Sequence, residues 1–160
     1  MRVLFQRVRR SAVRVDGQVI GSIGAGALLL VGIGRGDEER DLKWMARKVT
    51  TLRVFPDAEG RMNRSLLEQG GAILAVSQFT LYGETRKGRR PSFIEAEEPK
   101  RAARLHEGFV EYLRAEGVGE VATGQFGASM EVELINDGPV TLWIESPREN
   151  TQEAETAASS

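Results

Sequence analysis

Two runs of consecutive apolar residues, at 27–31 and 72–76, constrain the fold of this chain more than any other feature. They read Ala-Leu-Leu-Leu-Val and Ala-Ile-Leu-Ala-Val. An apolar run this short, with no polar residue in it, is typical of a strand that is buried on both faces. We therefore expect two central strands that other elements cover from both sides.

Hydrophobic periodicity predicts the elements around these two strands. Alternation over 3–15 predicts an N-terminal strand, and the Asp-Gly pair at 16–17 is typical of a hairpin that leads into a second strand. Alternation at 130–134 and 140–144 predicts the last two strands. Two helices are predicted, with apolar stripes made of Leu42, Met45, Val49 and Leu52 and of Leu105, Phe109, Tyr112 and Leu113. We expect an α+β fold in which a largely antiparallel, barrel-like sheet packs against two main helices.

The length suits one domain rather than two. The chain has 160 residues, of which 41% are hydrophobic and 28% charged, as in an ordinary globular protein. We expect the domain to span 1–146 and the segment 147–160, rich in Glu, Thr, Ala and Ser, to be a disordered acidic and polar tail. Since no secretory pattern or membrane-spanning run is present, we expect a cytoplasmic protein without membrane contact.

The composition also excludes several kinds of chemistry. The chain contains no cysteine, so disulfides, thiolate nucleophiles and cysteine-bound metals are ruled out. His106 is the only histidine, and a catalytic zinc commonly uses several. We expect neither a metal nor a cofactor. Because His106 falls beside the apolar stripe of the second helix, we expect an ordinary helix histidine there.

A polar segment directly after the second apolar run is the first candidate site. It reads Ser77-Gln78-Phe79-Thr80-Leu81. Functional sites are often built at the ends of rigid elements, where the backbone is held in place. The hydroxyls and backbone N–H groups of this segment could hold an oxyanion. The alternative is that Ser77 and Gln78 simply end the strand and satisfy backbone groups.

Two further segments carry candidate residues. The segment 136–141 reads Asn-Asp-Gly-Pro-Val-Thr, and its spacing alone favours a turn between two strands. The segment 83–91 contains two glycines and four basic residues, and these are Arg86, Lys87, Arg89 and Arg90. Such a loop is suited to bind phosphates, although a charged surface loop would have the same composition.

Taken together, Ser-Gln-Phe-Thr-Leu at 77–81 and Gly-Pro-Val-Thr at 138–141 resemble the paired signature motifs of the D-aminoacyl-tRNA deacylase family. Partial matches at 6–8, 88–93 and 124–130 follow the same order, so that the resemblance covers about 1–145. It implies an enzyme that hydrolyses the ester bond of D-aminoacyl-tRNA, and also of glycyl-tRNA, while rejecting L-aminoacyl-tRNA.

The resemblance also implies where the site lies. Family members are homodimers, and a cis bond between Gly138 and Pro139 would insert into the partner's site, where its carbonyls hold the α-amino group of the substrate. The catalytic segment would consist of Ser77, Gln78, Phe79 and Thr80. Phe126 and Met130 would shape the adenosine end. The residues expected to contact phosphates of the tRNA are Arg7, Arg86, Lys87, Arg89 and Arg90.

The sequence is compatible with two mechanisms and with two rival functions. The attacking water could be oriented by the 2′-hydroxyl of the terminal adenosine, or Thr80 could be the nucleophile, although no base is evident beside it. The rival functions are a non-catalytic RNA-binding module and a small-molecule esterase that uses Ser77 and His106.

Overall fold

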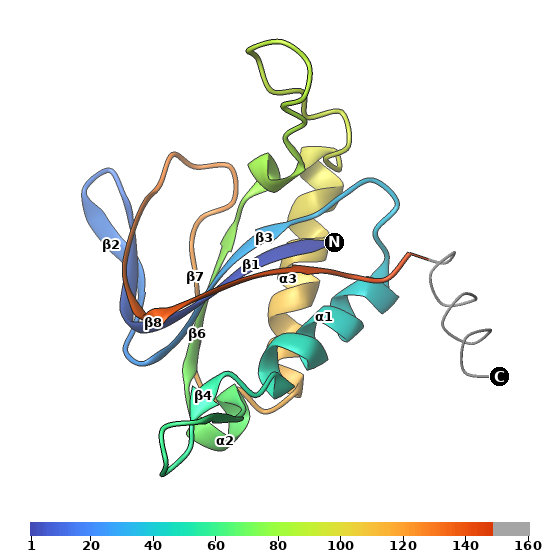
Figure 1. Cartoon of the computed structure of the whole chain (residues 1–160). Coiled ribbons are helices and arrows are strands. Elements are labelled where there is room, and N and C mark those ends of the chain that lie inside the picture. Colours follow the sequence, from blue (N-terminus) through green and yellow to red (C-terminus); the bar gives the residue numbers. More distant parts are fainter. Residues whose placement is uncertain (149–160) are drawn as a thin grey trace, which may run out of the picture.

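In the computed structural model, which describes residues 1–148, a curled sheet packs against two long helices (Figure 1). The strands of this sheet are β1 (Arg2–Val15), β2 (Gln18–Ile23), β3 (Gly26–Gly32), β6 (Ala72–Ser77), β7 (Val121–Thr123) and β8 (Glu131–Glu145). Two short strands, β4 (Phe55–Pro56) and β5 (Met62–Arg64), pair separately. The helices are α1 (Glu39–Thr51), α2 (Leu66–Gln69), α3 (Pro99–Ala115) and the 3-10 helix η1 (Phe79–Tyr82).

Strand β1 organises the sheet, because it pairs with three antiparallel neighbours. Its first half pairs with β3, its second half with β2, and β8 follows it along nearly its whole length. The pairs β3–β6 and β6–β7 are parallel, so the sheet is mixed. Its outer strands meet, since a Cβ added to Gly21 of β2 would lie 2.5 Å from the carbonyl oxygen of Thr123 in β7. The expected α+β fold with a barrel-like sheet is confirmed, and its parallel part is larger than expected.

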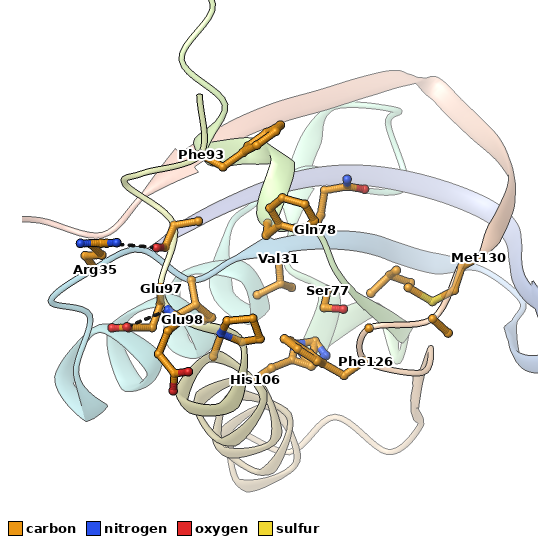
Figure 2. Close-up of a pocket in the computed structure, with 18 of the residues that line it drawn as sticks. Val31, Arg35, Ser77, Gln78, Phe93, Glu97, Glu98, His106, Phe126 and Met130 are labelled. Carbon is orange, nitrogen blue, oxygen red and sulfur yellow. Dashed lines mark hydrogen bonds between the residues drawn. The ribbon is translucent and has the colours of Figure 1, made fainter. Parts of the chain in front are cut away.

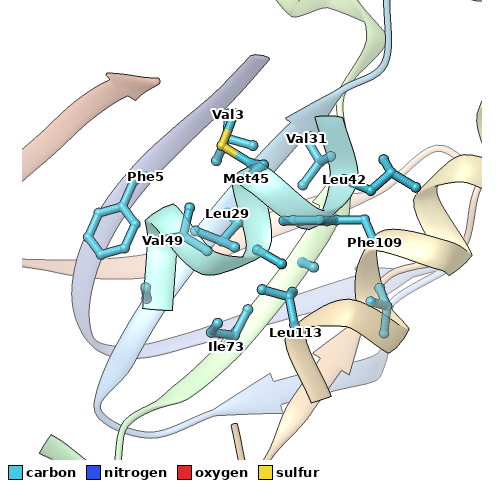
Figure 3. Close-up of a cluster of buried hydrophobic side chains, with 14 of the residues drawn as sticks. Val3, Phe5, Leu29, Val31, Leu42, Met45, Val49, Ile73, Phe109 and Leu113 are labelled. Carbon is cyan, nitrogen blue, oxygen red and sulfur yellow. The ribbon is translucent and has the colours of Figure 1, made fainter. Parts of the chain in front are cut away.

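The two apolar runs are buried on both faces, as predicted. In β3 and β6, Leu29 and Ile73 face the helices and join a cluster with Met45 of α1 and Phe109 of α3 (Figure 3). Residues between them face the inside of the curled sheet, where Leu28, Leu74 and Val76 pack with side chains of β1 and β2. Each central strand therefore contributes to two cores, which explains the absence of polar residues in both runs.

The C-terminal strand differs most from the expectation. The sequence predicted a turn at 136–139, but β8 runs through it unbroken. The pairing with β1 shows how the strand continues. Gln6 pairs with Thr141 and Val8 with Asn136, so that 137–140 lie opposite Arg7 alone. This is a β-bulge larger than the usual type, in which two residues oppose one. The Asp-Gly pair and the proline, which favour a turn locally, are accommodated in the bulge instead.

Smaller differences concern the chain ends and loops. The segment 60–71, where no helix or strand was predicted, contains β5 and α2. Ser146, the last residue of the predicted domain, donates its hydroxyl to Asp41 (2.7 Å). Most of the predicted tail, from 149 onwards, lies outside the described residues. Among residues 1–148, the structure has no helix with both the length and the apolarity needed to cross a membrane.

Replacing the central aromatic residue of the helix–sheet core should destabilise the fold strongly. Phe109 is fully buried, and Phe109→Ala should lower the free energy of unfolding by about 3–5 kcal/mol, because the cavity it leaves cannot collapse completely. Arg104→Ala, on the exposed face of the same helix, should change it by less than about 0.5 kcal/mol. Urea unfolding at one fixed protein concentration would measure both, and similar values for the two variants would contradict this account of the core.

Candidate active site

A cavity of about 650 Å³ opens where the parallel strands β3 and β6 end (Figure 2). Its walls come from the ends of these strands, from η1, from α3 and from the segments 93–99 and 126–132. Most lining residues are apolar, and these are Val31, Ile33, Val76, Phe79, Phe93, Ala96, Pro99, Ala102, Phe126, Ala128, Met130 and Val132. A mostly apolar cavity with a few polar groups is the usual form of a small-ligand site.

The segment 77–79 forms the wall of the cavity at the end of β6. Ser77 and Gln78 line it, as does Phe79. The N–H of Gln78 donates to the carbonyl of Val31 (2.7 Å) and is therefore already used. The N–H groups of Phe79 and Thr80, which begin η1, have no backbone acceptor within residues 1–148. These two amides could therefore hold an oxyanion, whereas the amide of Gln78 could not.

Thr80 stands apart from the other three residues of this segment. It is exposed and is not among the lining residues of the cavity. Its hydroxyl accepts a short hydrogen bond from the side-chain amide of Gln78. No imidazole or carboxylate in the described part of the chain is hydrogen-bonded to this hydroxyl, so the structure shows no base that would activate it.

Phe126 and Met130 also line the cavity. Gly124 makes room for Met130, because a Cβ at this glycine would lie 2.6 Å from the Met130 sulfur. Near Gln78, Phe79 packs edge-to-face on Phe93, with ring centroids 5.0 Å apart. Phe79 is nevertheless 58% exposed. The cavity therefore has aromatic side chains at both ends (Figure 2).

His106 lines the same cavity from α3, although an ordinary helix histidine was expected there. It is 8% exposed, and burial lowers its pKa to about 4, so that the imidazole is neutral at pH 7. It has no hydrogen bond to Ser77 in the described structure, and the structure gives no Ser-His pair of the kind that an esterase needs. Within residues 1–148, no group of three or more His, Asp and Glu side chains is placed to bind a metal ion.

The bulge in β8 presents Gly138 and Pro139 at the surface. Their peptide bond is cis, and both residues are exposed. The side chain of Asn136 ties the base of the bulge, because it accepts from the N–H of Val140 (3.1 Å) and donates to the hydroxyl of Thr141 (2.8 Å). Neither Gly138 nor Pro139 lines the cavity of its own chain. The two predicted halves of the site are therefore separate within one chain.

Arg7, predicted to contact phosphate, has a different place in the structure. Its side chain is 11% exposed. The guanidinium donates to the carbonyls of Asp137 (3.1 Å) and Val54 (2.6 Å) and lies 3.4 Å from the Asp137 carboxylate. A cation that is buried and engaged in this way has little surface left for a tRNA phosphate. Its contacts instead anchor the bulge, a role that the sequence did not indicate because the contacts come from distant segments.

The four basic residues of the segment 83–91 lie on a loop that projects beyond the end of α3 (Figure 1). Backbone hydrogen bonds between Glu84 and Ser92 close the loop at its base. Arg86 is paired with the carboxylate of Glu84 (2.6 Å), and this pairing lowers the pKa of Glu84 to about 2. The remaining three are exposed, and these are Lys87, Arg89 and Arg90.

The buried imidazole predicts a pH-dependent contribution to stability. Because the pKa of His106 falls from 6.5 to about 4 on folding, the unfolded chain binds the proton more readily, and stability should decrease as the pH falls from 6.5 to 4. The decrease should reach about 3 kcal/mol. Unfolding of wild type and His106→Phe at pH 7.5 and pH 4 would measure it. A difference between the two proteins that is the same at both pH values would contradict the shift.

Comparison with known proteins places this geometry in a family. The family model D-Tyr-tRNA(Tyr) deacylase matches residues 4–145. The D-aminoacyl-tRNA deacylase of Chloroherpeton thalassium is 58% identical over 147 residues, which are 92% of this chain and 97% of that protein. The enzyme of the same name from Thermomicrobium roseum is 58% identical over 146 residues, covering 91% of this chain and 94% of that one.

Solved structures agree with this comparison. A structure described as c-Myc DNA Unwinding Element Binding Protein matches with a TM-score of 0.88 and 40% identity, over 92% of this chain and all of that one. A probable eukaryotic D-amino acid tRNA deacylase, 20% identical over 90% of this chain and 98% of that one, has the same fold with a TM-score of 0.75. The resemblance noted at 77–81 and 138–141 is confirmed: the chain belongs to the D-Tyr-tRNA(Tyr) deacylase family.

Proposed function

We propose that this protein hydrolyses the ester bond of D-aminoacyl-tRNA and of glycyl-tRNA, releasing the amino acid and free tRNA, and that it rejects L-aminoacyl-tRNA. Membership of the deacylase family supports the reaction itself. The observation that carries the finer proposal is the position of 77–80. Phe79 of this segment lines the apolar cavity, and the amides of Phe79 and of the next residue, Thr80, have no backbone acceptor within residues 1–148. The bulge with Gly138 and Pro139 is exposed and does not line this cavity.

The separation of these two parts supports a site shared between two subunits. In the proposed two-fold dimer, Gly138 and Pro139 of one subunit enter the cavity of the other. Large apolar side chains are exposed on β8, where Ile135 is 42% and Trp143 48% exposed. At the cavity, Phe79 is 58% exposed. Exposed apolar residues of this size are typical of surfaces that a partner covers.

Selection between D- and L-amino acids would then rest on backbone atoms. The carbonyls of Gly138 and Pro139 would accept hydrogen bonds from the α-amino group and fix the orientation of the α-carbon. A D side chain would point away from the bulge, whereas an L side chain would meet main-chain atoms and be excluded. Glycine has no side chain to exclude, so its ester should also be cleaved.

Catalysis would come from positioning and from stabilisation of developing charge. The amides of Phe79 and Thr80 would donate to the carbonyl oxygen of the ester as it becomes an oxyanion. The 2′-hydroxyl of the terminal adenosine would orient the attacking water. The basic loop would bind phosphates without reading sequence, mainly through Lys87, Arg89 and Arg90, since the charge of Arg86 is already paired.

The chirality of the substrate tests the proposed function most directly. Purified protein should deacylate D-Tyr-tRNA and Gly-tRNA and should leave L-Tyr-tRNA intact. Release of labelled amino acid in single-turnover reactions would measure all three. Efficient cleavage of L-Tyr-tRNA would contradict selection by the bulge, and complete resistance of Gly-tRNA would contradict selection by exclusion. Binding of all three without cleavage would instead indicate an RNA-binding module.

A substrate without the 2′-hydroxyl separates the two mechanisms. If that hydroxyl orients the water, a D-Tyr-tRNA that ends in 2′-deoxyadenosine should be cleaved about 10²–10⁴-fold more slowly. Thr80→Ala should then keep most of the activity on the normal substrate, because the structure shows no base at Thr80. If Thr80 is the nucleophile, Thr80→Ala should be inactive, the deoxy substrate should be cleaved, and an acyl-enzyme should be trapped.

A further inference from the structure

The imidazole of His106 lines the cavity but has no function in the proposed reaction. In residues 1–148, the Nδ1 atom of His106 is the one buried side-chain nitrogen or oxygen without a hydrogen-bond partner. Buried polar atoms without partners are rare in folded proteins, and each one needs an explanation. His106 also lines the cavity and lies beside the ring of Phe126, at a centroid distance of 6.3 Å (Figure 2).

The surroundings of the ring indicate which nitrogen carries the proton. An enclosed N–H without an acceptor is less favourable than an enclosed lone pair without a donor. The neutral imidazole should therefore keep Nδ1 as the lone pair and carry its proton on Nε2. Because Nδ1 has almost no exposed surface and the residue lines the cavity, Nε2 is the nitrogen that can reach a molecule bound there.

We propose that Nε2–H of His106 donates a hydrogen bond to a ring nitrogen of the terminal adenine, while Phe126 packs against that base. This inference rests on the proposed function. The amino-acid side chain varies between substrates, so a fixed donor would not suit it, whereas the terminal nucleoside of tRNA is always adenosine. An aromatic side chain next to a single hydrogen-bonding group is also the usual way in which proteins bind an unstacked base.

Substrates with altered bases test the contact together with His106→Phe, which keeps an aromatic ring but removes both nitrogens. D-Tyr-tRNAs would end in adenosine or in its 1-deaza, 3-deaza or 7-deaza analogue. Wild type should lose about tenfold in kcat/KM on one deaza analogue. On the substrate that ends in adenosine, kcat/KM of His106→Phe should be about tenfold below that of wild type. On that deaza analogue, kcat/KM of His106→Phe should fall no further. Purine riboside, which lacks only the 6-amino group, should show no such coupling with His106.

The controls distinguish failure of this inference from failure of the proposed function. Tyr112 lies on α3, as His106 does, but outside the cavity. Tyr112→Phe removes a hydroxyl that donates a hydrogen bond to Glu39 of α1, and this variant should behave as wild type. If wild type leaves D-Tyr-tRNA intact, the proposed function fails. If wild type cleaves D-Tyr-tRNA and His106→Phe has the same kcat/KM as wild type, only the inference about His106 fails. The same conclusion holds if His106→Phe lowers kcat/KM by one constant factor on adenosine and on every analogue, because the two changes are then independent.

A spectroscopic measurement covers the case in which His106→Phe does not fold. His106 is the only histidine, so ¹⁵N-histidine labelling of the wild-type protein reports this ring alone. Adding adenosine 5′-monophosphate should shift the Nε2 resonance, and the 7-deaza, 3-deaza or 1-deaza nucleotide that lacks the acceptor should not. Resonances that stay unchanged in a large excess of adenosine 5′-monophosphate would contradict the contact.

Discussion

The hydrogen bond from the Gln78 N–H to the Val31 carbonyl (2.7 Å) determines where the cavity begins. It is the last bond of the parallel ladder between β3 and β6, whose final pair is Val31 and Ser77, and the chain turns into η1 at Phe79. Gly32 allows this close approach, because a Cβ there would lie 3.2 Å from the Gln78 carbonyl oxygen. The helices α1 and α3 pack on the same pair of strands. The cavity, the free amides and the placement of His106 on α3 therefore all depend on where β3 and β6 end.

A second constraint acts on the bulge of β8. Arg7 lies opposite it in β1 and binds the Asp137 and Val54 carbonyls, which connects the bulge to the segment before β4. Gly138 is tightly enclosed on this side, since an added Cβ would lie 2.9 Å from the Arg7 guanidinium. A charged hydrogen bond from a largely buried donor is stronger than a neutral one. This anchoring explains how an exposed dipeptide can keep one orientation.

The sequence predicted the central strands and both long helices, because apolar periodicity is a local signal. Of the residues that the motifs indicated, those that line the cavity are Ser77, Gln78, Phe79, Phe126 and Met130, whereas most of its wall comes from residues that no motif indicated. It did not predict the continuity of β8, since an Asp-Gly-Pro segment favours a turn unless a neighbouring strand pairs on both sides of it. The positions of Arg7 and His106 also escaped prediction. A basic residue in an Arg-rich strand and a histidine on a helix gain their meaning only from segments distant in sequence, such as Val54 and Phe126.

Complementation between two damaged subunits tests the shared site most directly. Phe79→Pro would remove one of the two amides that are proposed to hold the oxyanion, and Gly138→Ala would alter the bulge, where a Cβ clashes with Arg7. Each homodimer should be nearly inactive on D-Tyr-tRNA. After subunit exchange, half of the dimers should be mixed and hold one intact site each, so that activity should return to about a quarter of the wild-type value. Mixed dimers, purified by two different tags, that are no more active than either parent would contradict the account.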